Sequence, residues 1–210
     1  MNLSIRITTA GLLAAAAQFA AKRDVRYYLC GVLLEVRENK MSAVATDGHK
    51  MIRVDLGSAD IPTPDFKGIL PSPELLIKHC AGRNACHSAD LHIVDGLAKL
   101  TIVGTSITLG NLIDGTFPDY RRVMVSGEVE ASASSFNPAL LAAVCKSAEF
   151  IGAARRCKIQ PLAIETCHQS STRITIGEGP AATVVLMPLR MSAEPKAFIR
   201  DAFEPVPGAA

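Results

Sequence analysis

Apolar and polar residues alternate along several short stretches of the chain, and an apolar run of helical character interrupts them. Residues 3–8 alternate as in a half-buried strand. The run 10–22 that follows is rich in Ala and Leu, which favours a buried helix. Strand patterns at 27–36, 41–46 and 50–56 complete a series of one strand, one helix and three strands.

The same series recurs twice, at a spacing of about sixty to seventy residues, which indicates an internal repeat. Ser72 and Asn137 are predicted helix caps, and Pro73 and Pro138 follow them at the first helical position. The second unit has predicted strands at 68–71, 90–94, 97–103 and 106–112. The third has a strand at 129–134, a helix at 138–148, and strands at 159–166, 173–176 and 183–187. The pattern therefore predicts an α+β fold of tandem βαβββ units.

Composition narrows the class of protein. The chain has 210 residues, of which 49% are hydrophobic and 20% charged, so it is typical of a globular protein with a substantial core. With no Trp, three Tyr and seven Phe, this core must be mainly aliphatic. The net charge of +2 is close to neutral, so any contact with nucleic acid must come from a local basic surface.

Six cysteines raise the question of metal or thiol chemistry. His79, Cys80, Cys86 and His87 lie within nine residues, but structural zinc sites favour ligand pairs two to four residues apart. Two interpretations of this cluster are open: a metal or thiol site of a small enzyme, or a helix end that contains Cys and His by chance. We favour the helix end. Asp47 and His49 resemble a catalytic pair, but no nucleophile motif accompanies them. We expect no cofactor, no metal and no catalysis.

The run 10–22 also resembles the apolar part of a secretory signal, with Arg6 ahead of it. However, the strand-like start at 3–8 and the end in Lys22-Arg23-Asp24, without a small-residue cleavage site, favour a buried helix. The run is also too short and too interrupted for a membrane span. We expect a cytoplasmic protein that has reduced thiols and no membrane association.

Four segments carry a resemblance to a known family. These are Arg26-Tyr-Tyr-Leu-Cys-Gly-Val-Leu-Leu-Glu-Val36 with Val44-Ala-Thr-Asp-Gly-His-Lys50, then Asp114-Gly-Thr-Phe-Pro-Asp-Tyr-Arg-Arg-Val123, Phe136-Asn-Pro-Ala-Leu-Leu141 and Val184-Val-Leu-Met-Pro-Leu-Arg190. They resemble the bacterial DNA polymerase III beta subunit, the replicative sliding clamp, and the first two resemble its middle domain closely. The resemblance implies a DNA-clamp fold, with helices lining the inner face of a ring and sheets outside.

A clamp of this kind holds duplex DNA without reading its sequence, through basic groups that attract the phosphates. The resemblance and the positions near the predicted helices imply these DNA-binding residues: Lys22, Arg23, Tyr27, Tyr28, Lys78, Arg83, Lys146, Arg155 and Arg156. The alternative is that the basic residues only favour the helix dipole and solvation, and that the tyrosines only pack on a strand.

In the family, polymerases and other proteins dock a short apolar peptide between the last two domains. The resemblance implies that this partner cleft is formed here by the following residues: Leu29, Thr46, Gly48, His49, Lys50, Met51, Pro118, Val123, Val185, Met187, Pro188, Leu189 and Arg190. Met and Leu side chains provide an adaptable apolar surface for such a peptide. The family commonly has Arg and Leu where Lys50 and Met51 stand.

The chain departs from the family in its number of units, because the family has six per chain and this sequence has three. We expect a clamp domain at 1–124, a partial clamp domain at 125–191 and a tail at 192–210. Four chains would supply the twelve units of a ring, so we expect a homo-oligomer, a dimer or a tetramer.

The predicted function is a non-enzymatic sliding clamp of a shortened phage or mobile-element type. It is expected to bind double-stranded DNA, DNA polymerase and other clamp-binding peptides, with a clamp loader as a further partner. The alternative is an interaction module or decoy that binds clamp partners without encircling DNA.

Overall fold

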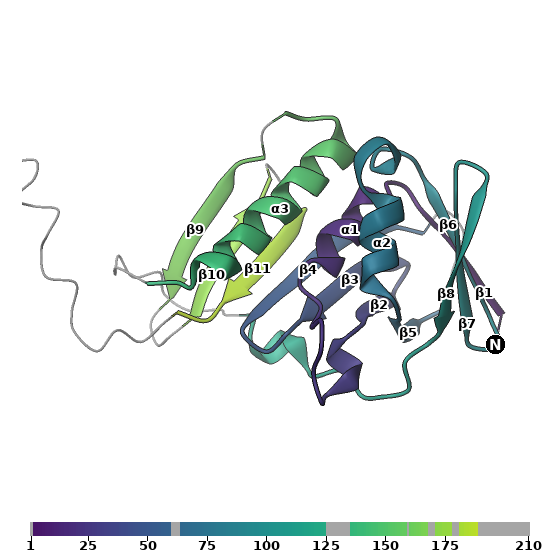
Figure 1. Ribbon diagram of the computed structural model, residues 1–210, viewed down its shortest axis with the longest axis horizontal. Helices are drawn as coiled ribbons and strands as arrows, with labels where there is room; N and C mark the ends of the chain where they lie inside the picture. The colour runs from purple at the N-terminus through teal and green to yellow at the C-terminus, as the bar shows by residue number, and fades with distance from the viewer. Residues whose placement is uncertain are drawn as a thin grey trace, which may run out of the picture.

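The computed structural model describes residues 2–59, 64–124, 135–158, 160–167, 171–177 and 181–188. Within these ranges the chain forms three α-helices and two antiparallel sheets. Figure 1 shows the helices side by side over one face of the larger sheet, with the smaller sheet at the N-terminal end of the molecule.

The elements follow the predicted repeat. The first unit contains β1 (Asn2–Ile7), α1 (Gly11–Ala17), the 3-10 helix η1 (Tyr27–Leu29), β2 (Val32–Arg37), β3 (Lys40–Thr46) and β4 (Lys50–Ser58). The second contains β5 (Phe66–Leu70), α2 (Pro73–Cys80), η2 (Gly82–Asn84), β6 (Ala89–Val94), β7 (Leu97–Ile102) and β8 (Thr105–Asn111), and η3 (Tyr120–Arg122) follows it. The third contains α3 (Pro138–Arg155), β9 (Leu162–Cys167), β10 (Ser171–Ile176) and β11 (Ala182–Leu186).

The first two units exchange their first strands. β1 pairs with β6 of the second unit, in the four-stranded sheet β1-β6-β7-β8. In return, β5 pairs with β2 of the first unit. The exchange gives each sheet a strand from the other unit, so the two units fold as one body.

The third unit extends the larger sheet, whose strand order is β5-β2-β3-β4-β11-β10-β9. β11 pairs with β4, with Met51 opposite Val185 and Lys50 opposite Leu186. The junction between β4 and β11 therefore lies between the two parts of the chain that the sequence assigned to separate domains.

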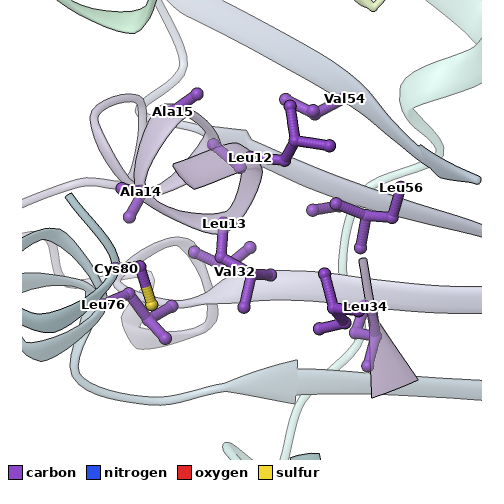
Figure 2. Close-up of a cluster of buried hydrophobic side chains, with 14 of the residues drawn as sticks. Leu12, Leu13, Ala14, Ala15, Val32, Leu34, Val54, Leu56, Leu76 and Cys80 are labelled. Atoms are coloured by element: carbon purple, nitrogen blue, oxygen red, sulfur yellow. The ribbon is translucent and has the colours of Figure 1, made fainter. Parts of the chain in front are cut away.

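Helix α1 is buried along its whole length between α2 and α3 (Figure 1). A Cβ on Gly11 would lie 2.9 Å from Cβ of Ala85 and 3.0 Å from Cβ of Ala154, so glycine permits this close approach. The buried hydroxyl of Ser147 on α3 donates a hydrogen bond of 2.8 Å to the carbonyl oxygen of Ala15. Figure 2 shows the aliphatic core that α1 shares with α2 and with the larger sheet.

Several local predictions need correction. Ser72 does not cap α2: it has a φ of +56° and its hydroxyl donates to the carbonyl oxygen of Leu109 at 2.9 Å. The predicted strand at 27–36 begins with the 3-10 turn η1, because residues Tyr27–Leu29 close a turn against the end of the α1 segment. By contrast, Asn137 caps α3 as predicted, accepting the Ala139 N–H at 3.0 Å.

Helix lengths also differ from the predictions. α1 ends at Ala17, before the predicted 22, and α3 continues to Arg155, past the predicted 148. The third unit's predicted first strand, at 129–134, and the predicted tail, at 192–210, lie outside the described residues.

Candidate functional site

A cavity of about 220 Å³ lies beside the junction of β4 and β11. Ten of the thirteen predicted partner-cleft residues line it: Leu29, Thr46, Gly48, His49, Lys50, Met51, Pro118, Val123, Val185 and Met187. They come from η1, the β3–β4 turn, β4, the segment around η3, β11 and the residue after it. The fold thus brings together residues that lie more than a hundred positions apart in the sequence.

The cavity is apolar at its base and at part of its rim. Leu29, Met51 and Val185 are buried and belong to one hydrophobic cluster. Val123 and Met187 are 44% and 51% exposed, although both are apolar. Exposed apolar side chains beside a concave apolar base are typical of a ligand or peptide site.

The turn between β3 and β4 forms one wall. The Asp47 carboxylate accepts the N–H groups of His49 at 2.9 Å and Lys50 at 3.0 Å, and it also pairs with the Lys50 ammonium group. Gly48 adopts a φ of +93°, a conformation that favours glycine. The N–H of Met187 donates to the carbonyl oxygen of His49 at 3.0 Å, so the turn is joined to the end of β11.

Burial acts to raise the pKa of Asp47, but its hydrogen bonds to Lys50 and to the backbone N–H groups lower it more. The net pKa lies below the ordinary value. The carboxylate is therefore ionised at neutral pH, and it holds the turn in the shape that lines the cavity.

The segment around η3 forms the opposite wall, and three side chains anchor it to β2. The Tyr120 hydroxyl donates to the Glu35 carboxylate at 2.6 Å, and the Arg121 guanidinium donates to the same oxygen at 2.7 Å. The Arg121 guanidinium also lies over the Tyr120 ring, 4.7 Å from its centroid. Burial raises the pKa of Glu35, and these hydrogen bonds lower it more, so the net pKa is below its ordinary value.

Three lining residues were absent from the predicted set: Arg26, Asp119 and Tyr120. All three lie inside or directly beside the segments that carry the family resemblance, and this proximity was the available signal. Arg26 donates to the Asp24 carboxylate at 3.0 and 2.8 Å, and these hydrogen bonds hold the pKa of Asp24 at about 2. The pair fixes the Arg26 guanidinium at the cavity rim, where the Asp24 carboxylate balances its charge.

The remaining three predicted cleft residues are not among the lining residues. Pro188 is half-buried next to Met187, and Leu189 and Arg190 lie outside the described residues.

All seven Lys and Arg residues among the predicted DNA-binding residues are exposed. Lys22 and Arg23 follow α1, Lys78 and Arg83 lie on or just after α2, and Lys146, Arg155 and Arg156 lie on or at the end of α3. The residues of α2 and α3 thus lie on these helices or close to their ends, whereas Lys22 and Arg23 lie five and six residues past the end of α1, which is shorter than predicted.

Some of these side chains have partners within the chain. The Lys146 ammonium group pairs with Glu149 at 2.6 Å, and the Arg156 guanidinium lies 3.8 Å from the Cys86 sulfur. Tyr27 is 59% exposed and Tyr28 is half-buried, and their rings meet edge to face with centroids 5.8 Å apart.

The cysteine and histidine cluster does not come together as a ligand set. Cys80 is fully buried in the hydrophobic core, where burial raises the pKa of its thiol to about 12, so it is a poor metal ligand or nucleophile. Among the described residues, no group of three or more Cys, His, Asp or Glu side chains is placed to hold a metal ion. In the same part of the chain, no helix combines the length and the apolar character that crossing a membrane requires.

Comparison with known sequences gives a consistent result. A family model described as "DNA polymerase III beta subunit, central domain" matches residues 9–119. The beta sliding clamp of Pseudomonas aeruginosa is 36% identical over 136 residues, which are 60% of this chain and 35% of the relative. The beta sliding clamp of Escherichia coli K12 is 38% identical over 117 residues, which are 52% of this chain and 30% of the relative. The matched segment thus spans about a third of the length of these relatives.

Solved structures show the same fold at lower sequence identity. The DNA polymerase sliding clamp of Pseudomonas aeruginosa, crystallised with a ligand, matches with a TM-score of 0.69 at 20% identity, over 90% of this chain and 67% of the other. The sliding clamp of Bacillus subtilis matches with a TM-score of 0.70 at 13% identity, over 90% and 64% respectively. These matches confirm the predicted α+β clamp fold.

Proposed function

The chain belongs to the DNA polymerase III beta subunit family, and from this premise we propose that it is a sliding clamp. In this role it binds double-stranded DNA without sequence specificity and docks peptides of DNA polymerase and other replication proteins in its cleft. It works in the cytoplasm by binding, without catalysis, and a clamp loader is a further partner. We also propose the two-part organisation at 1–124 and 125–191.

The cavity at the β4–β11 junction is the observation that carries this proposal. Its base is apolar, and its exposed rim carries the apolar side chains of Val123 and Met187. A short peptide with one or two large apolar side chains suits this surface. The flexible thioethers of Met51 and Met187 allow peptides of different shape to pack there.

The positions of the basic residues support DNA binding. Lys22, Arg23, Lys78, Arg83 and Arg155 are exposed and lie on the helices or in the segments that follow them. Point charges on long flexible side chains attract phosphates in a salt-dependent way that does not depend on sequence. Tyr27, exposed in η1 close to Lys22 and Arg23 in the sequence, adds an aromatic surface at the same end of α1.

A double substitution tests the cleft. We expect Met187→Ala with Val123→Ala to weaken binding of a labelled polymerase peptide by about tenfold or more, because several apolar groups no longer pack on the peptide. Both side chains are about half exposed, so the fold should persist. Fluorescence anisotropy measures the affinity, and circular dichroism checks the fold.

The matched control is Val103→Ala, an apolar residue that is 68% exposed in the β7–β8 turn, away from the cavity. The affinity of this control variant for the peptide should equal that of the unmodified chain. If the double variant binds the peptide as tightly as the control does, the cleft assignment is wrong.

A second function is compatible with the cavity, because the described residues that line it all come from one chain. On this alternative, the protein binds clamp partners without encircling DNA and acts as an interaction module or decoy. Retention on circular duplex DNA, with release after the circle is cut, supports the sliding clamp. Failure to stay on circular DNA, with peptide binding intact, supports the decoy.

A further inference from the structure

The end of β11 fixes the point from which residues 189–210 continue. Met187 lines the cavity and donates its N–H to the carbonyl oxygen of His49 at 3.0 Å, and Pro188 is the next residue. The sequence then continues for twenty-two residues, 189–210. These residues therefore start at the rim of the apolar cavity, beside a Met187 side chain that is about half exposed.

The sequence of residues 189–210 contains a short stretch that is rich in large apolar side chains. Residues 189–195, here the connector, end in Ser-Ala-Glu-Pro, a composition typical of polar linkers. Residues 196–203, here the apolar segment, contain Phe198, Ile199 and Phe203. Stretches of sequence that remain without a binding surface are typically poor in aromatic residues. The composition of the apolar segment therefore indicates that it has an apolar surface to bind.

The other phenylalanines show how this protein accommodates such side chains. Five of the seven lie among the described residues, and all five are buried or pack against a hydrophobic core: Phe19, Phe66, Phe117, Phe136 and Phe150. The remaining two stand in the apolar segment. An aromatic side chain buries roughly 150–250 Å² of surface when it packs, so two of them in one short segment favour contact with an apolar site.

The cavity provides an apolar site within reach of the apolar segment. Its base is buried and apolar, and the apolar rim side chains of Val123 and Met187 are about half exposed. The seven residues of the connector extend to roughly 23–25 Å. A cavity of about 220 Å³ is much narrower than this reach, and Met187 itself lines it. The connector is therefore long enough for the apolar segment to turn back onto the cavity.

We propose that the apolar segment docks in the cleft of its own chain, with Phe198 and Ile199 against the apolar base, and so competes with partner peptides. This inference rests on the cleft assignment in the proposed function, and it adds regulation of that cleft. A partner peptide must then displace the apolar segment before it binds.

The connector determines how strongly the apolar segment competes. A short flexible connector holds its two ends at an effective concentration on the order of 1 mM. If the apolar segment as a free peptide has a dissociation constant on the order of 0.1 mM, it occupies its own cleft about nine times in ten, and a competing peptide binds about tenfold more weakly. A second copy in a dilute sample is present at far lower concentration, so docking within one chain is favoured.

Phe198→Ser with Ile199→Ser in the full chain tests the docking. The probe is a labelled peptide with the sequence of residues 194–205, and fluorescence anisotropy measures its affinity. We expect the probe to bind this segment variant about tenfold more tightly than the unmodified chain, because the variant's own segment no longer fills the cleft. A polymerase peptide should gain affinity by the same factor. Val206→Ser, at an apolar position outside the apolar segment, is the matched control and should bind both peptides as the unmodified chain does.

Val123→Ala with Met187→Ala, added to the segment variant, locates the binding. These changes remove apolar groups from the cavity rim, so we expect the probe to bind about tenfold more weakly than it binds the segment variant. Probe binding that does not respond to them would place the apolar segment elsewhere and overturn the proposal.

The remaining outcomes also decide the proposal. Tighter probe binding to the segment variant, lost again with the rim changes, supports it. Equal affinity of the probe for the segment variant and the unmodified chain overturns it, and so does competition that strengthens with protein concentration, because the apolar segment would then dock between copies. A polymerase peptide that depends on Val123 and Met187 but not on Phe198 and Ile199 overturns this inference alone and leaves the cleft in place. A polymerase peptide that ignores the rim changes overturns the cleft assignment itself.

Discussion

At the scale of single residues, two carboxylates shape the candidate cleft. Asp47 holds the β3–β4 turn through two backbone N–H groups and Lys50. Glu35 holds the opposite wall through Tyr120 and Arg121. Both carboxylates act by positioning the backbone segments that line the cavity, so neither needs to touch a ligand bound there.

Tyr120→Phe tests the anchor of the η3 wall. The change removes the hydroxyl that donates to Glu35, and a hydrogen bond to a charged group contributes about 1.5–3 kcal/mol. We expect the free energy of unfolding to fall by about this amount in urea titrations and peptide affinity to fall with it. Tyr27→Phe, at an exposed ring, is the matched control and should change neither quantity. Equal stability of the two variants would contradict the anchoring role.

The pH dependence of stability follows from the same carboxylates. Their folded-state pKa values are lowered, so the unfolded chain binds more protons in acid. Their contribution is complete above the ordinary values of 4.5 for Glu and 3.8 for Asp, and it is lost as the pH falls through the lowered values. We expect the denaturant concentration at the midpoint of unfolding to be constant near neutral pH and to fall below about pH 4.

Asp47→Asn tests how much this one carboxylate contributes to the pH dependence of stability. The variant should be less stable at neutral pH, because it loses the charge that pairs with Lys50. It should also lose less stability on acidification, since one lowered pKa is gone. An acid transition as steep as that of the unmodified chain would show that Asp47 does not contribute to it.

At the scale of elements, α1 is the centre of the molecule. Its small residues let α2 and α3 approach on both sides, and no residue from Gly11 to Ala17 is exposed. This explains an Ala-rich run that the sequence alone could also assign to a secretory signal. Burial of a helix on every side requires small or apolar side chains throughout.

Gly11→Ala tests this packing. The added Cβ would lie 2.9 Å from the Cβ of Ala85 and 3.0 Å from the backbone oxygen of Phe150, so the helices must move apart. We expect a loss of about 1–3 kcal/mol in the free energy of unfolding, measured by urea titration. Ala153→Val enlarges an exposed residue on α3 and should cost clearly less. A smaller loss for Gly11→Ala than for this control would argue against tight packing around α1.

At the scale of the whole molecule, a chain with a net charge of only +2 must gather its basic groups to bind DNA. The predicted basic residues are exposed and lie on the helices or in the segments that follow them. On the four-stranded sheet, the exposed Lys99 of β7 points away from the core.

Lys22→Ala with Arg23→Ala tests this distribution. If both groups neutralise phosphates, affinity for duplex DNA should fall, and the slope of log affinity against log salt should become shallower by about 0.9 for each phosphate that is no longer neutralised. Electrophoretic mobility shifts or anisotropy at several salt concentrations give the slope. Lys99→Ala is the control, and an equal change in slope for both variants would remove these residues from the DNA-binding surface.

Local patterns were enough to predict the repeat and the α+β class, because periodicity is a property of neighbouring positions. The ten predicted residues that line the cavity came instead from the family resemblance. Local patterns also identified the Asn137 cap, whose hydrogen bond reaches only two residues along the chain. Ser72 was assigned wrongly because its hydroxyl bonds instead to Leu109, a partner that local spacing does not reveal.

Strand pairing and the completed site, by contrast, depend on contacts between distant parts of the chain. Alternation shows that a strand has a buried face, but not that β1 belongs with β6 and β5 with β2. The bond between Glu35 and Tyr120 joins residues 85 positions apart, and the cavity exists only because β11 pairs with β4. The place of β9 beside β10 in the larger sheet, at its end among the described strands, is likewise a property of the assembled sheet that alternation does not reveal.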